Sequence, residues 1–213
     1  MAAAADDGLA IRGRRRLLAA AACCVCGAVH APRLWAQAAS RPAPKTIDPR
    51  IAELVSERRT LWLRRGSEEL RATYWTAAKG RNDDEYLKIC WILRDLQADR
   101  VFTMDRGLLD TLAGLQAWLA HGGVDQPIVL HSGYRTSRTN RATEGAALNS
   151  RHVVGQAADI SVPGVTSVKL AGMASLLGQG GTGFYVGRGF VHVDTGDERV
   201  WIDQRGRRKA PGA

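Results

Sequence analysis

The feature that most constrains the fold is a change of hydrophobic pattern at Gly122 and Gly123. Before this pair, apolar residues recur at the three- and four-residue spacing of amphipathic helices. After it, short β-like runs alternate with glycine-rich loops, and one further helix fits near residues 166–178. Helices followed by a small sheet with one inserted helix are typical of an α+β domain. We therefore expect an α+β fold with N-terminal helices and then a small, mainly antiparallel sheet.

Local signals place individual elements within this plan. The stretch from Arg59 alternates on either side of "RRGSEE", as a β-hairpin does. Asn82, followed three residues later by Glu85, begins a helix whose apolar stripe extends to Leu96. A second helix runs from about Arg106 to the glycine pair. The expected strands are "PIVLHSGYR", "AADISV", "TGFYV" and "FVHVD".

The N-terminal segment has the pattern of an export signal. Several arginines precede an apolar run from Leu17 to about Val29, and Ala36 and Ala38 offer a cleavage site. The run is shorter than the roughly 20 residues that span a bilayer, so we expect no transmembrane helix in the mature chain. The arginines permit a twin-arginine route, and general secretion stays open. The expected organisation is an export signal at 1–38, a linker at 39–48, a folded domain at 49–203 and a basic tail at 204–213.

Composition narrows the class of partner. The formal net charge is +9, and the residues beyond the predicted signal keep a positive excess. Such an excess favours nucleic acid, anionic lipid or a carboxylate-rich cell wall. No basic-aromatic patch or nucleic-acid motif is present, and an export signal argues against a nucleic-acid binder. Three of the four cysteines lie in the predicted signal, so Cys90 is left without a disulfide partner.

Few residues could hold a catalytic metal. A hydrolytic zinc site needs three ligands from histidine, aspartate or glutamate and one open position for water. Of the five histidines, His30 lies in the predicted signal, and we expect structural roles for His121 and His131 at element ends. The remaining candidates are His152, Asp159 and His192.

Two of these candidates lie in apolar strands. Asp159 follows Ala157 and Ala158, and a carboxylate in such company is costly unless a cation or several donors satisfy it. In "GFVHVDTG", period-two alternation puts His192 and Asp194 on one face of the strand. On spacing alone, a zinc site and a buried polar cluster are both open interpretations.

Four ordered motifs resemble the M15-type zinc peptidases, and in particular their periplasmic branch, which includes a murein endopeptidase. They are "SGYRT" (132–136), "SRHVVGQAADI" (150–160), "GGTGFY" (180–185) and "GFVHVDTG" (189–196). The similarity covers roughly residues 55–202 and implies the fold shared with D-alanyl-D-alanine peptidases and the hedgehog signalling domain. It implies that Zn²⁺ is bound by His152, Asp159 and His192. It also implies that Arg135 faces the scissile carbonyl, where a guanidinium stabilises the developing oxyanion.

The chain departs from the better-known relatives at one position. They carry an acidic residue three positions before the last ligand histidine, whereas this chain has Gly189. Asp194 is the expected replacement as general base, but it could equally orient a metal ligand. Glu144 and Tyr185 are further candidates for proton transfer.

The sequence thus predicts a zinc-dependent metallopeptidase, exported to the periplasm, that hydrolyses cross-links or stem-peptide bonds of peptidoglycan. The stem peptides carry carboxylates, which suits a basic surface. Endopeptidase and carboxypeptidase activity are both open, as is the oligomeric state. The alternative is a non-catalytic, zinc-stabilised module that binds the cell wall, which the absence of the upstream acid permits.

Overall fold

The computed structural model describes residues 52–53, 55–177 and 180–204. Eight strands form one mixed sheet in the order β3-β2-β1-β4-β5-β7-β6-β8. The strands are β1 (Arg58–Arg65), β2 (Glu68–Thr76), β3 (Gly80–Arg81), β4 (Ile128–Ser132), β5 (Ala157–Ser161), β6 (Gly181–Tyr185), β7 (Phe190–Asp194) and β8 (Arg199–Asp203). The helical elements are α2 (Asp83–Ile92), α3 (Arg106–His121), α4 (Ser137–Ala142), the 3₁₀ turn η1 (Arg151–Val154) and α5 (Ser167–Leu177).

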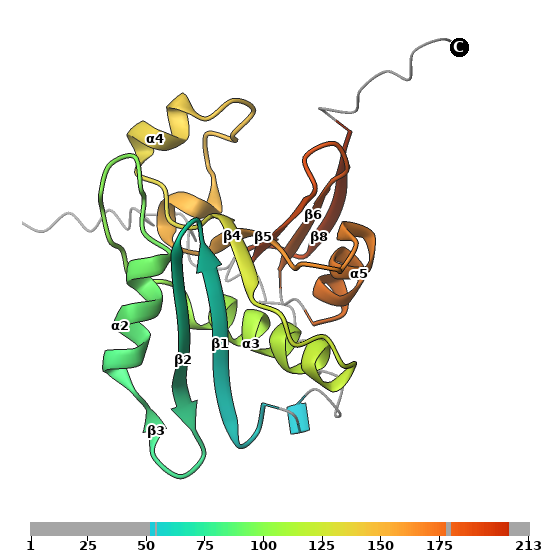
Figure 1. The fold of residues 1–213 in the computed structure, drawn as a ribbon. Helices are drawn as coiled ribbons and strands as arrows, with labels where there is room; N and C mark the ends of the chain where they lie inside the picture. The colour runs from blue at the N-terminus through green and yellow to red at the C-terminus, as the bar shows by residue number, and fades with distance from the viewer. Residues whose placement is uncertain (1–51, 54, 178–179, 205–213) are drawn as a thin grey trace, which may run out of the picture. The chain divides into compact units, whose positions relative to one another are not determined.

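The α+β class and the mainly antiparallel sheet are confirmed. Within the described residues, five of the seven strand pairings are antiparallel, and the pairs β1–β4 and β6–β8 are parallel. The predicted hairpin is β1–β2, and Gly66 takes a left-handed conformation in its turn, with φ of 59°. This hairpin precedes the helices in the chain. Its strand β1 pairs with β4, so the hairpin extends the same sheet, as Figure 1 shows.

Helices pack against one face of the sheet. α2 contacts β2, α3 contacts β1, and α5 contacts β6 and β7. The predicted helix starts are present: the Asn82 side chain accepts a hydrogen bond from the backbone N–H of Glu85, and Asp105 caps α3 in the same way. α2 ends at Ile92, earlier than its apolar stripe predicts, so Leu96 lies outside the helix and is half exposed.

Strand alternation gives the sheet two chemically different faces. Ala158 and Ile160 of β5, with Val191 and Val193 of β7, belong to the hydrophobic core under the helices. The alternate residues of the same two strands point to the opposite face. That face carries the polar residues Asp159, His192 and Asp194, which are buried despite their charge or polarity.

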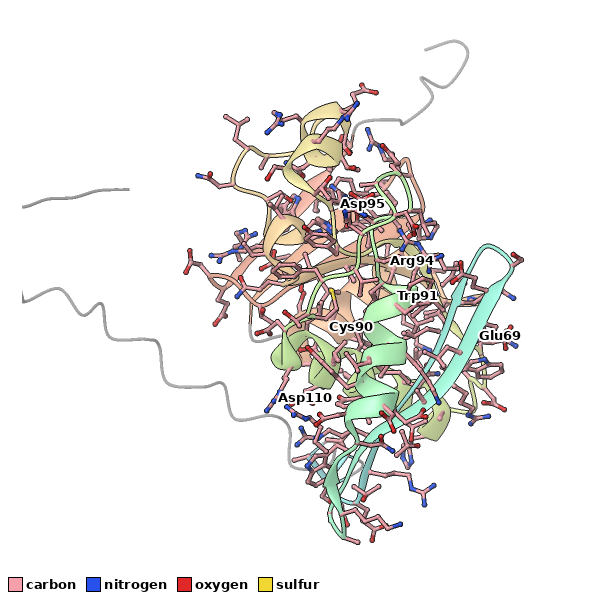
Figure 2. All side chains as sticks on the ribbon, turned by 90° about the vertical axis from the view of Figure 1, so that its left-hand side faces the viewer. Glu69, Cys90, Trp91, Arg94, Asp95 and Asp110 are labelled. Carbon is pink, nitrogen blue, oxygen red and sulfur yellow. The ribbon has the colours of Figure 1, made fainter. Side chains whose placement is uncertain are left out.

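Several sequence predictions concern residues outside the described part of the chain. The export signal at 1–38 and the linker at 39–48 lie there, as does the basic tail from residue 205 onward. These stay predictions. Among the residues that the structure does describe, no helix combines the length and the apolar character that crossing a membrane requires. Cys90 lies on α2, where it is buried in the core (Figure 2).

Candidate metal centre

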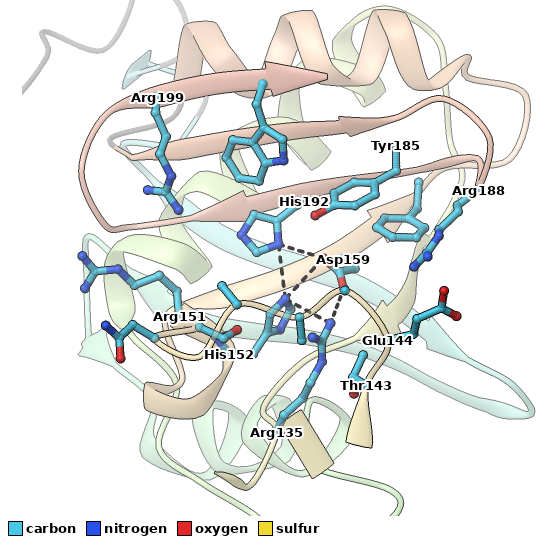
Figure 3. Close-up of a pocket in the computed structure, with 17 residues that line it drawn as sticks. Arg135, Thr143, Glu144, Arg151, His152, Asp159, Tyr185, Arg188, His192 and Arg199 are labelled. Carbon is cyan, nitrogen blue, oxygen red and sulfur yellow. Dashed lines mark hydrogen bonds and ion pairs between the residues drawn. The ribbon is translucent and has the colours of Figure 1, made fainter. Parts of the chain in front are cut away.

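Three separate segments bring the predicted ligands together. Asp159 on β5 and His192 on β7 are direct partners in the antiparallel register. The η1 turn adds His152, and the loop closes behind it because Gly155 adopts a left-handed conformation with φ of 68°. One donor atom from each of the three side chains lies within 4.8 Å of the others. The sequence-predicted set therefore forms one cluster (Figure 3).

The donor atoms of this cluster are nearly in contact. The Nδ1 atom of His192 lies 2.8 Å from Oδ1 of Asp159. The Nε2 atom of His152 lies 3.3 Å from the same oxygen and 3.2 Å from His192 Nδ1. All three side chains are buried, with 2 to 8% of each residue exposed.

Hydrogen bonds on the outer side of each imidazole set its orientation. His152 Nδ1 lies 2.7 Å from the carbonyl oxygen of Gly133, and His192 Nε2 lies 2.9 Å from Oδ2 of Asp194. Both oxygens accept, so the outer ring nitrogens carry the protons. When both rings are neutral, their inner nitrogens direct lone pairs at each other and at Asp159. Two imidazole nitrogens and one carboxylate that converge in a buried site are a donor set that fits a metal ion.

The charges of the cluster follow from its burial and contacts. Burial lowers the pKa of His152, which favours the neutral imidazole that a metal needs. For Asp159, burial acts to raise the pKa, but the facing His152 and His192 hold it well below its usual range. Burial acts to lower the pKa of His192, but Asp159 and Asp194 raise it. A metal ion bound by His192 would take the place of the extra proton that this raised pKa favours.

Arg135 lies beside the cluster, at the start of the loop that follows β4. Its Nη2 atom is 2.5 Å from Oδ2 of Asp159 and 3.2 Å from Nε2 of His152. Its Nε–H donates to Oγ of Ser132 at 2.7 Å. The guanidinium is thus fixed next to the carboxylate, and it also lines the adjacent cavity.

A buried aspartate that the sequence reasoning missed supports the Arg135 loop. Asp95 is 2% exposed and lies just after α2 (Figure 2). Its Oδ2 accepts the backbone N–H of Thr136 at 2.8 Å, and its Oδ1 accepts those of Gln97 and Ala98. Thr136 is 41 residues away in the chain. The sequence therefore carried no local signal for this contact.

The same loop requires glycine at position 133. A Cβ atom there would lie 2.3 Å from the carbonyl oxygen of Leu93, which already accepts the N–H of Tyr134 at 2.8 Å. The close approach of the two backbones positions the Gly133 carbonyl for its bond to His152. Gly133 of "SGYR" therefore helps to orient His152, a candidate metal ligand.

Asp194 lies on the far side of His192 from Asp159. Its Oδ2 accepts from His192 Nε2 and from Arg199 at 2.7 Å, and its Oδ1 accepts the backbone N–H groups of Gly181 and Gly196. Asp194 is 1% exposed and does not line the cavity. Burial acts to raise its pKa, but His192 and the backbone amides hold it well below its usual range. This is the geometry of a group that orients a ligand.

A cavity of about 460 Å³ opens over the cluster. The β6–β7 hairpin contributes one wall and the segment between α4 and η1 contributes the other. Tyr185 points into it, while Glu144 lies at the rim (Figure 3). Trp201 packs against His192, with ring centroids 5.3 Å apart, and Gly183 must be glycine because a Cβ would lie 2.3 Å from this indole.

The remaining sequence candidates lie elsewhere. His131 Nε2 is 2.8 Å from Oγ of Ser161 and does not line the cavity, and His121 is the last residue of α3. Gly189 has a φ of 71° in the β6–β7 turn, and nothing lies within 4 Å of where its Cβ would be. An acidic side chain at this position would be strained and would meet open space. A glycine at position 189, where the better-known relatives have an acidic residue, therefore suits the left-handed backbone of this turn.

Comparisons with known proteins match the part of the chain that contains these motifs. The family model described as "Peptidoglycan L,D-endopeptidase MepK", an M15 peptidase family, matches residues 53–201. The chain belongs to this family. The MepK protein of Escherichia coli (strain K12), a peptidoglycan L,D-endopeptidase, is 34% identical over 138 residues, which are 63% of this chain and 74% of that protein. The probable peptidoglycan L,D-endopeptidase MepK of Haemophilus influenzae is 33% identical over 131 residues, or 60% and 69%.

Membership in the MepK family confirms the resemblance to M15 peptidases and makes the chain a peptidase by descent. Metal dependence is typical of M15 peptidases, and the cluster of His152, Asp159 and His192 is a candidate for that metal site.

Proposed function

We propose that this chain is a zinc-dependent peptidoglycan endopeptidase that hydrolyses L,D peptide bonds in the cross-links of the cell wall. The observation that carries the proposal is the buried convergence of two imidazoles and one carboxylate beneath a cavity. Family membership supports the reaction class, and the names of the relatives support an endopeptidase over a carboxypeptidase.

His152, Asp159 and His192 would hold the zinc ion. Two histidines and one carboxylate form a donor set typical of catalytic zinc, which keeps a further position open. Bound there, zinc supplies Lewis-acid activation of water and of the scissile carbonyl. The carbonyl of Gly133 and the carboxylate of Asp194 hold the two imidazoles in the tautomers that leave their inner nitrogens available.

Arg135 is proposed to stabilise the oxyanion that develops on the scissile carbonyl. Its guanidinium is held by Ser132 and Asp159, so it needs little reorganisation when charge develops. Tyr185 points into the same cavity from the β6–β7 hairpin (Figure 3).

Asp194 is proposed to position His192 and not to accept the proton of the attacking water. Both of its oxygens are occupied by four hydrogen-bond donors, and His192 lies between it and the other ligands. A general base must come within hydrogen-bond reach of the water, and Asp194 does not line the cavity where that water enters.

The proposed place of action is the periplasm. This part of the proposal rests on the predicted export signal at residues 1–38 and on the chemistry of the substrate, which lies in the cell envelope.

Digestion of cross-linked muropeptides by the purified protein tests the proposal. With zinc supplied, wild type should release products whose masses show one peptide bond broken, and His152→Ala should release none. If wild type holds stoichiometric zinc and binds muropeptides but breaks no bond, the protein is a wall-binding module.

A further inference from the structure

The cavity over the candidate metal centre is rich in arginine. Its lining includes four arginines, whereas the acidic residues that line it are Asp159 and Glu144. Three of the four arginines are engaged within the protein. Arg135 contacts Asp159, Arg199 contacts Asp194 at 2.7 Å, and Arg151 donates to the side-chain oxygen of Gln156 at 3.0 Å.

Arg188 differs from the other three. Within the residues that the structure describes, its guanidinium makes no hydrogen bond or ion pair, although its backbone N–H donates to the carbonyl of Tyr185 at 3.1 Å. The residue is exposed and its side chain lines the cavity, near the rim where Glu144 also lies (Figure 3). Among the described residues, Arg188 is thus the arginine of the cavity lining that forms no ion pair within the protein.

The backbone around Arg188 is held in place on both sides. The carbonyl oxygen of Tyr185 accepts from the N–H groups of Arg188 and Gly189, and the N–H of Val186 donates to the carbonyl of Asp203. The rings of Tyr185 and Phe190 stack with centroids 4.6 Å apart, across the base of the turn. The backbone that carries Arg188 is therefore already ordered, so less ordering is needed when a ligand binds.

The hairpin that carries Arg188 also carries His192, only four residues further along the chain. Arg188 and His192 line the same cavity, so a ligand group at Arg188 would share this cavity with the bond that is cut at the metal centre. Guanidinium groups bind carboxylates through paired, charge-assisted hydrogen bonds.

We propose that Arg188 is a specificity-determining residue that binds a free carboxylate of the substrate peptide in the cavity over the metal centre. The inference rests on the proposed function. The carbonyl that an endopeptidase attacks is part of an amide, so the free carboxylate is a lateral one, carried by a side chain of the peptide. The enzyme is then selective for cross-links whose neighbouring carboxylate is ionised and unmodified.

Steady-state kinetics on two matched cross-linked peptides test the proposal, one with its lateral carboxylates free and one with them amidated. For the free-carboxylate peptide, Arg188→Gln should raise KM about tenfold, equivalent to about 1.4 kcal/mol, with kcat within about twofold of wild type. For the amidated peptide, wild type and Arg188→Gln should have the same KM. The matched control is Arg138→Gln, which removes the same charge from an exposed position on α4 outside the cavity and should behave as wild type.

Equal losses on both peptides, or no change in Arg188→Gln, would overturn the carboxylate assignment. Titration calorimetry with analogues of both peptides, N-methylated at the scissile amide, separates this inference from the proposed function. Tighter binding of the free-carboxylate analogue to wild type alone, with no turnover of either substrate, would refute the peptidase activity and keep the subsite. Equal binding of the two analogues would refute the subsite whatever the turnover.

Discussion

The role of Asp194 can be decided by Asp194→Asn. The carboxylate accepts from His192 Nε2 at 2.9 Å and from Arg199, and its other oxygen accepts two backbone N–H groups. The side chain of asparagine has only one oxygen. It therefore cannot accept hydrogen bonds from both His192 and the backbone N–H groups, and one of these interactions is lost. One charge-assisted hydrogen bond lost in a buried site costs about 1.5 to 3 kcal/mol. We therefore expect zinc affinity to fall about 10- to 100-fold, the range seen when partners of metal-bound histidines are removed.

The assay is competition for zinc against a chelator of known affinity, followed by turnover at saturating zinc. If Asp194 positions His192, turnover of Asp194→Asn should recover to within about tenfold of wild type once the site is filled. A general base would give the opposite pattern, with zinc affinity unchanged and turnover reduced about 10²- to 10⁴-fold at any zinc concentration. That second pattern would refute our reasoning. Asp197→Asn is the matched control, because Asp197 lies three residues away with a fully exposed side chain.

Three further predictions concern the ligands and the loop that carries Arg135. His152→Ala should lose zinc and activity together, measured by metal content and muropeptide digestion, and stoichiometric zinc in this variant would count against the ligand assignment. Arg135→Ala should keep zinc but lose about 10²- to 10³-fold in kcat, and unchanged turnover would remove Arg135 from the mechanism. Asp95→Ala leaves the N–H of Thr136 without its acceptor, so chemical denaturation should show a loss of about 1 to 3 kcal/mol in unfolding free energy. Asp95→Asn should restore part of that loss, and full stability in Asp95→Ala would show that the contact is dispensable.

Much of the fold was predictable because its signals are local. The cap at Asn82, the hairpin turn at Gly66 and the end of α3 at Gly122 each depend on residues close in the chain. Strand alternation also placed His192 and Asp194 on one face, and the structure confirms that placement because both are buried there while Val191 and Val193 join the core.

The remaining features depend on contacts between distant segments. The Asp95–Thr136 bond spans 41 residues, and the contact of Gly183 with Trp201 depends on how β6 and β8 pair. No periodicity or spacing reports such contacts. The early end of α2 has a local cause instead: Asp95 accepts the N–H groups of Gln97 and Ala98, two and three residues further on, and turns the chain where the apolar stripe continues.

Spacing alone also left open whether Asp194 transfers a proton or orients a ligand. Both roles need a carboxylate next to His192 on the same strand face. The distinction lies in which nitrogen of His192 it contacts, and only three-dimensional geometry carries that information. The contact is with the outer nitrogen, Nε2.

The most direct test of the account is mass spectrometry of cross-linked muropeptides after incubation with the protein in three forms: as purified, stripped of metal, and reloaded with zinc. We expect cleavage by the first and third forms and none by the second, with one zinc ion per chain in the active protein. Undiminished cleavage by the metal-free form would contradict the claim that His152, Asp159 and His192 exist to hold a catalytic cation.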